Sequence, residues 1–298
     1  MFFLFIFIVI TRELYSMDFQ LNELTPDEKR IILNKGTEAP FSGKYNDFFE
    51  SGIYSCRHCG QGLYYSKDKF KSGCGWPAFD DEIPGAISKN TDSNDGRVEI
   101  TCSRCGGHLG HLFKGEELTP KNLRYCVNSI SLDLVPEKNI EKAYFAGGCF
   151  WGMEYFFSKQ YGVLHVMPGY MGGQLKNPSY KEVCSGKSGH AETIMILYDK
   201  TKVDFETLAK LFFEIHDPTQ VNRQGPDVGT QYRSAIFYSS EKQKDIAERL
   251  IKFLKEKGLN VVTELHTLSE FYPAEEYHRK YYLKSGKEPY CHVRIKRF

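Results

Sequence analysis

The sequence predicts two domains: a mainly β N-terminal domain that contains zinc, and a C-terminal α/β domain. A chain of 298 residues exceeds the size at which single hydrophobic cores usually stop growing. The first half is rich in glycine, aromatic residues and short apolar runs, which is typical of β-structure. The second half alternates strand-like and helix-like patterns, which is typical of an α/β domain. We assign residues 21–135 to the first domain, 136–142 to a linker and 143–298 to the second.

The charge pattern argues against a nucleic-acid partner. The net charge is +1, and 26% of the residues are charged. Residues 1–141 carry a net charge of −4, and residues 142–298 carry a net charge of +5. This difference between the halves is too small to indicate more than ordinary solvated surface charge. No basic stretch alternates with stacking aromatic residues, as single-stranded nucleic-acid sites require.

The N-terminal segment 1–20 allows three interpretations. Residues 1–10 form an apolar run that is shorter than the roughly 20 residues needed to span a bilayer. No Lys or Arg precedes the run, as a signal peptide would require, and Met17 stands just before the first globular-looking sequence. A misassigned start, a real signal or anchor within residues 1–16, and a packed segment remain open. We expect a cytoplasmic protein, or an envelope or secreted one if this segment is a signal or anchor; only residues 1–10 offer membrane association.

Local signals place the main elements. Thr25, Pro26 and Glu28 supply an N-cap, a first-turn proline and a capping-box acid for a helix over 25–35. Further elements follow from the spacing of apolar residues. They are strands at 98–100, 130–132, 143–146, 193–198 and 234–238, and helices beginning near 149 and covering 205–216 and 241–257, the last with Ile246, Leu250, Phe253 and Leu254 inward and Gly258 at its end.

Two CxxC pairs predict a zinc site in the first half. Cys56 and Cys59 form one pair, and Cys102 and Cys105 form the other. Each pair turns two thiolates toward one ion, and two pairs complete a tetrahedral site with no open position, so the metal is expected to be structural. An odd total of nine cysteines also argues against a disulfide-stapled secreted scaffold. A redox CxxC and an iron–sulfur cluster are the alternatives.

A reactive thiol is predicted at Cys126, between Arg124 and Asn128. A neighbouring cation or imidazole lowers the pKa of a thiol and favours the nucleophilic thiolate. His108 and His111 offer imidazoles that bind water and pass protons, and Trp76 offers a wall for an apolar group. The competing interpretation makes these histidines core or metal residues and Trp76 a packing residue.

Residues from about 21 to 134 resemble a B-type methionine sulfoxide reductase. The matching stretches are Gly36-Thr37-Glu38-Ala39-Pro40-Phe41, Ser72-Gly73-Cys74-Gly75-Trp76-Pro77, His108-Leu109-Gly110-His111 and Arg124-Tyr125-Cys126-Val127-Asn128-Ser129. The resemblance implies that Cys126 is catalytic and Cys74 resolving, and that the four CxxC cysteines bind zinc. It implies a substrate site formed by Trp76, His108, His111, Arg124 and Asn128.

A second reactive thiol is predicted at Cys149, which follows a strand and two glycines and opens a helix. A helix N-terminus favours a thiolate through its exposed N–H groups and its dipole. Phe150 and Trp151 follow and can wall an apolar pocket. A Glu such as Glu192 can protonate a departing oxygen, and a Tyr such as Tyr232 can orient it. Ordinary helix packing and a surface phenol are the alternatives for the aromatic residues.

Residues from about 142 to the end resemble an A-type methionine sulfoxide reductase. The matching stretches are Gly148-Cys149-Phe150-Trp151-Gly152, Gly189-His190-Ala191-Glu192, His216-Asp217-Pro218-Thr219-Gln220, Gly229-Thr230-Gln231-Tyr232-Arg233-Ser234 and Tyr277-His278. The resemblance implies a ferredoxin-like two-layer sandwich with Cys149 catalytic, Glu192 as the acid and Cys291 resolving. It implies substrate contacts from Phe150, Trp151, Tyr180, Asp227 and Tyr232, and a structural role for Cys184.

Together the two resemblances imply repair of both sulfoxide epimers. A sulfoxide is chiral at sulfur, so its epimers need two differently shaped pockets. The second domain is expected to reduce the S epimer and the first domain the R epimer, in free or protein-bound methionine sulfoxide. Each site would pass through a sulfenic acid and a disulfide that thioredoxin reduces, without an organic cofactor.

Two other classes remain open at this stage. One is a zinc-stabilised binding module fused to a thiol peroxidase or disulfide exchanger. The other is a non-catalytic redox sensor, which would form reversible disulfides without turnover. The aromatic residues beside Cys149 argue against both, because neither peroxides nor disulfides need a methyl-sized cradle.

Overall fold

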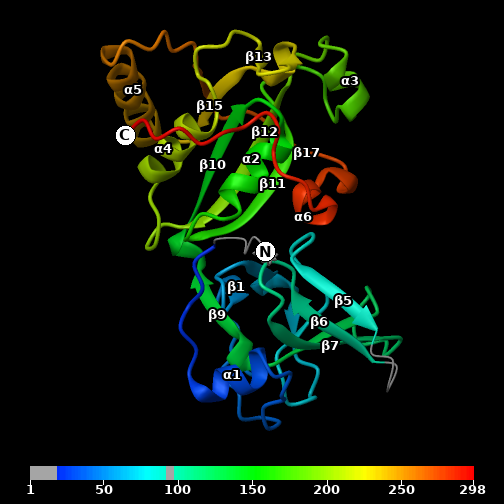
Figure 1. Ribbon diagram of the computed structural model, residues 1–298. Helices are drawn as coiled ribbons and strands as arrows, with labels where there is room; N and C mark the ends of the chain where they lie inside the picture. The colour runs from blue at the N-terminus through cyan, green and yellow to red at the C-terminus, as the bar shows by residue number, and fades with distance from the viewer. Residues whose placement is uncertain (1–18, 92–96) are drawn as a thin grey trace, which may run out of the picture.

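The computed structural model describes residues 19–91 and 97–298, so the predictions for residues 1–16 lie outside the described residues. Figure 1 shows two domains, one built before and one after the connection that follows β9. Among its described residues, the first contains the helix α1 (Pro26–Ile32) and nine strands. The strands are β1 (Gly52–Cys56), β2 (Gly62–Tyr65), β3 (Lys69–Phe70), β4 (Ala78–Phe79), β5 (Ile87–Thr91), β6 (Val98–Cys102), β7 (His108–Lys114), β8 (Leu123–Val127) and β9 (Leu132–Pro136).

The first domain is mainly β, as predicted. One sheet has the order β2-β1-β9 and the other has the order β3-β4-β8-β7-β6-β5. All pairings within both sheets are antiparallel. In the larger sheet Cys126 of β8 lies opposite His111 of β7 on one side and Ala78 of β4 on the other. The register therefore brings the predicted thiol beside one of the predicted imidazoles.

The second domain is α/β, with helices packed on one mixed sheet. The sheet order is β16-β15-β10-β12-β11-β17, and only the β15–β16 pair is parallel. Phe145 of the central strand stacks on Phe157 and Phe212 of the covering helices, at ring-centroid distances of 5.6 and 5.0 Å. The strands are β10 (Ile140–Gly147), β11 (Val163–Met171), β12 (Ala191–Asp199), β15 (Ser234–Tyr238), β16 (Glu264–Thr267) and β17 (Tyr272–Pro273), with β13 (Arg223–Gln224) and β14 (Asp227–Val228) as a separate pair. The helices are α2 (Phe150–Phe157), α3 (Tyr180–Cys184), α4 (Phe205–Ile215), α5 (Glu241–Glu256) and α6 (Tyr281–Ser285).

Helix ends follow the predicted capping chemistry. Thr25 Oγ1 accepts a hydrogen bond from Glu28 N, and the Glu28 carboxylate accepts one from Thr25 N, which completes the capping box of α1. Leu250 and Leu254 of α5 are buried as predicted. Phe253 is 38% exposed and stacks on Phe298 at 5.4 Å, so its predicted inward position is wrong. The C-terminal residue covers one face of this ring.

The two domains are joined tightly. Between β9 and β10 the chain makes only the 3-10 turn Glu137–Asn139, so residues 136–142 span the end of one strand, this turn and the start of the next. Leu164 of β11 and Leu197 of β12 are buried in the hydrophobic cluster of the first domain. A cavity of about 70 Å³ lies between the domains. The second domain therefore supplies part of the first domain's core.

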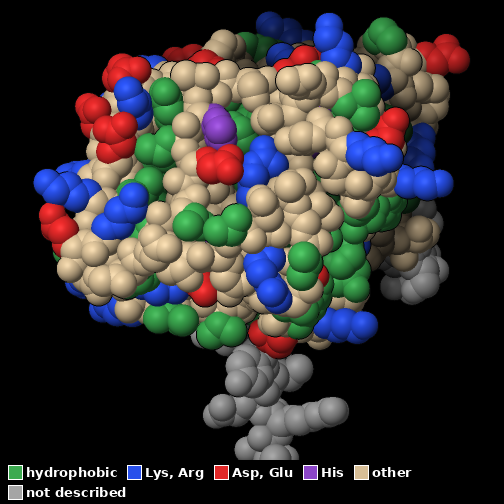
Figure 2. All heavy atoms as spheres, turned by 90° about the horizontal axis from the view of Figure 1, so that it is seen from above, with side chains coloured by type: hydrophobic (Ala, Val, Ile, Leu, Met, Phe, Trp, Pro, Cys, Tyr) green, Lys and Arg blue, Asp and Glu red, His purple; other side chains and the backbone are tan. Residues whose placement is uncertain are grey.

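The surface carries mixed charge. Figure 2 shows Lys and Arg interspersed with Asp and Glu on the face seen from above, with small groups of hydrophobic side chains between them. No stripe of one sign crosses this face, in keeping with the small net charge. Within the part of the chain that the structure describes, no helix is both long and apolar enough to cross a membrane.

Candidate active sites

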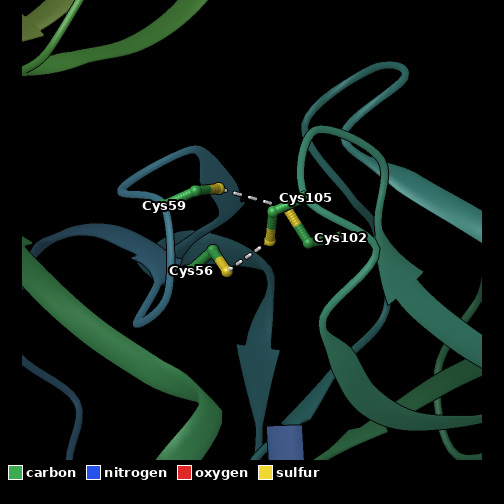
Figure 3. A group of neighbouring side chains, drawn as sticks. All are labelled: Cys56, Cys59, Cys102 and Cys105. Atoms are coloured by element: carbon green, nitrogen blue, oxygen red, sulfur yellow. Dashed lines mark hydrogen bonds between the residues drawn. The ribbon is translucent and has the colours of Figure 1, made fainter. Parts of the chain in front are cut away.

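The four CxxC cysteines converge on one point, from two loops that belong to β1 and β6 (Figure 3). The Sγ atoms of Cys56 and Cys105 are 3.7 Å apart, and those of Cys59 and Cys102 are 3.5 Å apart. Zinc–sulfur bonds of about 2.3 Å in a tetrahedron place sulfur atoms about 3.8 Å apart. The observed spacing therefore fits a four-thiolate zinc site.

The two turns that hold these cysteines have the same geometry. Gly60 N donates to Cys56 O and Gly106 N donates to Cys102 O, both at 2.8 Å. Both glycines have a positive φ, 73° and 72°, which a residue with a Cβ adopts at a cost. Each turn thus presents two thiols to the same side, as the paired spacing predicted.

The structure brings Cys74 and Cys126 together in the first domain. Their sulfur atoms are 3.8 Å apart, although 52 residues separate them in the chain. The hydrogen bond with Cys126 lowers the pKa of Cys74 to about 5, and Ser72 Oγ supports the charge from 2.9 Å. The same hydrogen bond, together with burial, raises the pKa of Cys126. The hydrogen bond between the two sulfur atoms thus couples the titrations of the two thiols.

A small cavity adjoins Cys126. It measures about 110 Å³, and its lining includes Trp76, His111, Cys126 and Asn128. Arg124 makes two hydrogen bonds to the Glu116 carboxylate, at 2.6 and 2.7 Å, and lies over the Phe113 ring. Its positive charge acts on both thiols and favours their ionised forms.

His108 lies behind this cavity rather than on its wall. Its Nδ1 is 2.8 Å from the Glu99 carboxylate, and its ring centroid is 5.7 Å from that of His111. Burial lowers the pKa of His108, so the imidazole is neutral at pH 7. The buried Nε2 atom has no hydrogen-bond partner among the described residues, which leaves a polar atom free to hold a water.

Glu38 is a residue of this site that the sequence analysis did not single out. Its carboxylate accepts hydrogen bonds from the backbone N–H groups of Ser129 and Ile130, at 2.5 and 3.1 Å. The backbone carbonyl of Glu38 accepts a hydrogen bond from Trp76 Nε1, and its backbone N–H donates one to Asn128 Oδ1. Glu38 therefore holds two cavity residues in place. Its position within a matching stretch was the available signal.

In the second domain Cys149 is the N-cap residue of α2, as predicted. The sulfur atoms of Cys149 and Cys291 and a carboxylate oxygen of Asp227 all lie within 4.8 Å of one another. The hydrogen bond with Cys149 lowers the pKa of Cys291 to about 6, and Nδ1 of His292 adds support from 3.0 Å. The hydrogen bond to Cys291 and burial raise the pKa of Cys149. The hydrogen bond between the two sulfur atoms thus couples the titrations of Cys149 and Cys291.

Glu192 of β12 lies beside this thiol pair. It is 2% exposed, and its carboxylate accepts a hydrogen bond from Phe150 N at 3.0 Å. Burial raises the pKa of Glu192 to about 8, so the group is protonated at neutral pH. Burial also raises the pKa of Tyr180 and of Tyr232, and the charge of Glu192 adds to this effect at both phenols. The site therefore holds three groups able to donate a proton.

The aromatic wall is organised by His278, a second residue that the sequence analysis left without a role. Nδ1 of His278 accepts from Trp151 Nε1 at 3.1 Å. Its ring packs against Phe150 and Tyr180 at centroid distances of 5.0 and 4.4 Å. Phe150 is buried in the core, whereas Trp151 is only partly buried. His278 thus fixes the relative positions of three predicted substrate residues.

The C-terminal segment closes the second site. Tyr290 donates to the Asp227 carboxylate at 3.1 Å, and His292 Nε2 lies 2.8 Å from Gly147 O. A Cβ on Gly152 would lie 2.2 Å from the His292 ring, so the glycine permits this packing. Cys149 is consequently only 6% exposed.

Cys184 is exposed at the end of α3 and does not fill the core.

Two thiol pairs, each beside groups that handle a proton or an oxygen, define the protein as a two-site thiol oxidoreductase. A family model described as peptide methionine sulfoxide reductase matches residues 141–298, and one described as the SelR domain matches residues 24–136. The chain belongs to the peptide methionine sulfoxide reductase family, with a B-type domain followed by an A-type domain. It is an oxidoreductase that reduces methionine sulfoxide.

Individual relatives support the assignment of the A-type domain. Peptide methionine sulfoxide reductase MsrA of Nautilia profundicola is 54% identical over 150 residues, which cover 50% of this chain and 87% of the relative. The MsrA of Sulfolobus acidocaldarius is 50% identical over 157 residues, covering 52% and 89% of the two chains. The crystal structure of Mxr1 from Saccharomyces cerevisiae in reduced form matches with a TM-score of 0.50 and 33% identity, over 53% of this chain and 93% of that one.

Proposed function

We propose that the A-type domain reduces the S epimer of methionine sulfoxide and that the B-type domain reduces the R epimer. The observation that carries this proposal is the presence of one thiol pair in each domain, in surroundings that differ in shape and chemistry. Glu192 and two phenols flank one pair, and His111 and Asn128 flank the other. Two dissimilar pockets suit two mirror-related sulfoxides. Free and protein-bound substrates are both covered by this proposal.

In the A-type site, Cys149 attacks the sulfoxide sulfur while Glu192 protonates the oxygen. Methionine leaves, and Cys149 becomes a sulfenic acid. The Cys291 thiolate then attacks the sulfenic sulfur, which forms the disulfide and displaces hydroxide. The hydroxide takes up the proton that the Cys149 thiol gave up during its attack, and it leaves as water. The lowered pKa of Cys291 suits this second step, because the thiolate is the attacking species. The C-terminal segment must first move aside, because Cys149 is only 6% exposed while that segment covers it.

In the B-type site, Cys126 attacks and Cys74 resolves. The Cys74 thiolate is placed to take the Cys126 proton as attack begins, and their 3.8 Å separation suits both the transfer and the later disulfide. A water held by His108 and His111 protonates the departing oxygen. Trp76 supplies the apolar wall of the cavity, and Arg124 steadies the thiolate charge.

We further propose that both disulfides are reduced by thioredoxin, which supplies two electrons and two protons per turnover through a mixed disulfide. The expectation of one structural zinc per chain is supported by the sulfur spacing of the four cysteines. A ferredoxin-like arrangement of the A-type domain, domain limits at residues 21–135 and 143–298, and a cytoplasmic location complete the proposal. A reducing compartment would keep these thiols ready to react.

The test is turnover of the separated S and R epimers of a dabsylated methionine sulfoxide with thioredoxin, thioredoxin reductase and NADPH. Cys149→Ser should abolish S-epimer turnover and leave R-epimer turnover intact, and Cys126→Ser should do the reverse. Equal loss of both activities in either variant would contradict the division of labour. Turnover of peroxide in place of sulfoxide would favour the thiol peroxidase alternative.

The resolving cysteines are tested by stoichiometry. Cys291→Ser and Cys74→Ser should each limit the affected site to about one turnover with thioredoxin, because the sulfenic acid then has no partner within the chain. Cys184→Ser is the matched control, since this cysteine is exposed and belongs to neither thiol pair. Undiminished multiple turnover in Cys291→Ser or Cys74→Ser would rule out the resolving role of that residue.

A further inference from the structure

The loop between Cys102 and Cys105 of the B-type domain reaches into the A-type domain. Ser103 Oγ accepts a hydrogen bond from Lys280 Nζ at 2.5 Å. The Arg104 guanidinium donates to Val163 O of β11 at 3.3 and 3.2 Å. Both residues between the two cysteines thus contact the neighbouring domain.

The Ser103 hydroxyl is itself held firmly. It donates to Gly85 O at 2.8 Å and also accepts from Gln61 Nε2 at 3.0 Å. Gln61 Oε1 accepts a second hydrogen bond from Lys280 Nζ at 3.3 Å. Gln61 also donates to Ala86 O, which fixes its amide. The Lys280 ammonium is therefore held in place by two polar side chains next to the cysteine cluster.

The conformation of Lys280 is unusual for a residue with a side chain. Its φ is 54° and its ψ is 38°, in the left-handed region that only glycine, Asn and Asp visit readily. Its backbone N–H donates to the Glu154 carboxylate of α2 at 2.7 Å. Burial lowers the pKa of Lys280 to about 8, so the amine is still mostly charged at neutral pH. Contacts at both ends of the residue hold this strained backbone.

The residues on either side of Lys280 hold Trp151 of the A-type pocket. Tyr281 stacks on the Trp151 ring with centroids 3.8 Å apart and planes 7° from parallel. His278 accepts the indole N–H of the same residue at 3.1 Å. The face and the edge of Trp151 are therefore fixed by the segment that Lys280 anchors.

We propose that Lys280 is a positioning residue of the A-type site, through which the Ser103 loop of the B-type domain fixes Trp151. The proposal rests on the proposed function of the A-type site. The ammonium anchors residues 278–281 to the other domain, and these residues in turn hold the aromatic wall. The B-type domain is thus a structural part of the A-type substrate pocket.

Lys280→Met tests the anchor, since it keeps most of the aliphatic stem and removes the ammonium. The KM for the S epimer should rise about 3- to 10-fold with kcat little changed, which is the size of effect seen when a coupling residue is altered. R-epimer kinetics should stay unchanged. Lys284→Met is the matched control, because this exposed lysine lies in the same helix and its loss should leave both activities unaltered.

Ser103→Ala should give the same selective rise in KM from the other domain, although Ser103 is remote from the A-type thiols in sequence. The double variant should be no worse than Lys280→Met alone, because that variant already removes the hydrogen bond to Ser103 together with the one to Gln61 Oε1. Additive effects, or equal losses for both epimers, would overturn the proposal. If the unaltered protein fails to reduce the S epimer, the proposed function fails instead.

A spectroscopic readout separates positioning from general destabilisation. The chain has two tryptophans, so Trp76→Phe leaves Trp151 as the sole indole emitter. In that background Lys280→Met should shift the Trp151 emission and raise its accessibility to acrylamide, while Lys284→Met should not. An unchanged Trp151 signal in Lys280→Met would contradict the proposal.

Discussion

Burial sets the protonation state of the residue that handles oxygen in the A-type site. Glu192 is 2% exposed, and its pKa is raised to about 8. At pH 7 the side chain is thus an acid, whereas an exposed Glu would be ionised. Burial also raises the pKa of Tyr180 and of Tyr232, although these phenols would be protonated at pH 7 without it. The fold therefore supplies proton donors at a pH where carboxylates normally have none to give.

S-epimer turnover should fall as the pH rises through about 8, because the protonated form of Glu192 is lost there. Glu192→Gln should lower kcat/KM for the S epimer about 10²- to 10⁴-fold, the usual contribution of a general acid. It should also remove the alkaline limb of the pH–rate profile. The limb is measured with a small dithiol as reductant, which avoids the pH dependence of thioredoxin. A limb that persists in Glu192→Gln belongs to another group.

Folding stability gives an independent check on the same group. The folded-state pKa of Glu192 lies above the ordinary value of 4.5 for this side chain, so the folded protein binds more protons between pH 4.5 and about 8. Its contribution to stability is present below that window and is lost as the pH rises through it. Glu192→Gln should flatten this part of the curve of unfolding free energy against pH. A slope equal to that of the unaltered protein would contradict the raised pKa.

At the scale of elements, the B-type site depends on a loop that carries no reacting group. Glu38 joins the loop at residues 36–41 to the turn after β8 through two backbone N–H groups. Glu38→Ala would leave both groups without an acceptor, at about 1–3 kcal/mol each where they are buried. R-epimer turnover should fall about 10- to 100-fold as Trp76 and Asn128 lose their positions, with S-epimer turnover unaffected.

Glu38→Gln is the matched control for that prediction. An amide keeps one carbonyl acceptor for the backbone and removes the charge, so most of the activity and stability should return. The comparison uses R-epimer kinetics together with thermal unfolding. If Glu38→Ala and Glu38→Gln behave alike, charge rather than backbone support is the important property of this side chain.

Elements with strong local signals could be predicted from the sequence. The capping box of α1, the strand Ser234–Tyr238 and the helix Phe205–Ile215 lie where their end signals and apolar spacing put them. Strand β11 was missed, because Pro168 and Gly169 interrupt its apolar run with residues that are typical of turns. Phe253 was placed inward because spacing does not reveal that the C-terminal Phe298 covers it on the outside.

The same limit applies to the sites. Short motifs identified the thiols, but the roles of Glu38 and His278 depend on backbone atoms and rings that meet only in the folded chain. The protonation of each thiol pair likewise depends on the partner sulfur, 52 residues away for Cys126. Residue type predicts chemistry, whereas tertiary contact decides which residue holds the charge.

At the scale of the whole molecule, the four-cysteine cluster of the first domain could hold one metal ion, which we propose is a structural zinc. The purified protein should contain one zinc per chain, by elemental analysis, and strong chelation should lower the melting temperature and abolish R-epimer turnover. Cys59→Ser should lose the metal, and Cys184→Ser should keep it, since Cys184 is exposed and outside the cluster. Iron-like visible absorption, or a metal-free protein of unchanged stability, would contradict the zinc assignment.

The burial of Leu164 and Leu197 in the first domain's hydrophobic cluster has a practical consequence for dissection of the chain. A cut in the turn Glu137–Asn139 would expose both leucines to solvent on the side that the first domain now covers. It would also expose the part of the first domain's core that these leucines now cover. Each separated half would gain an exposed hydrophobic patch that favours self-association. A preparation of the second half alone should therefore carry polar replacements at these two positions to stay monodisperse.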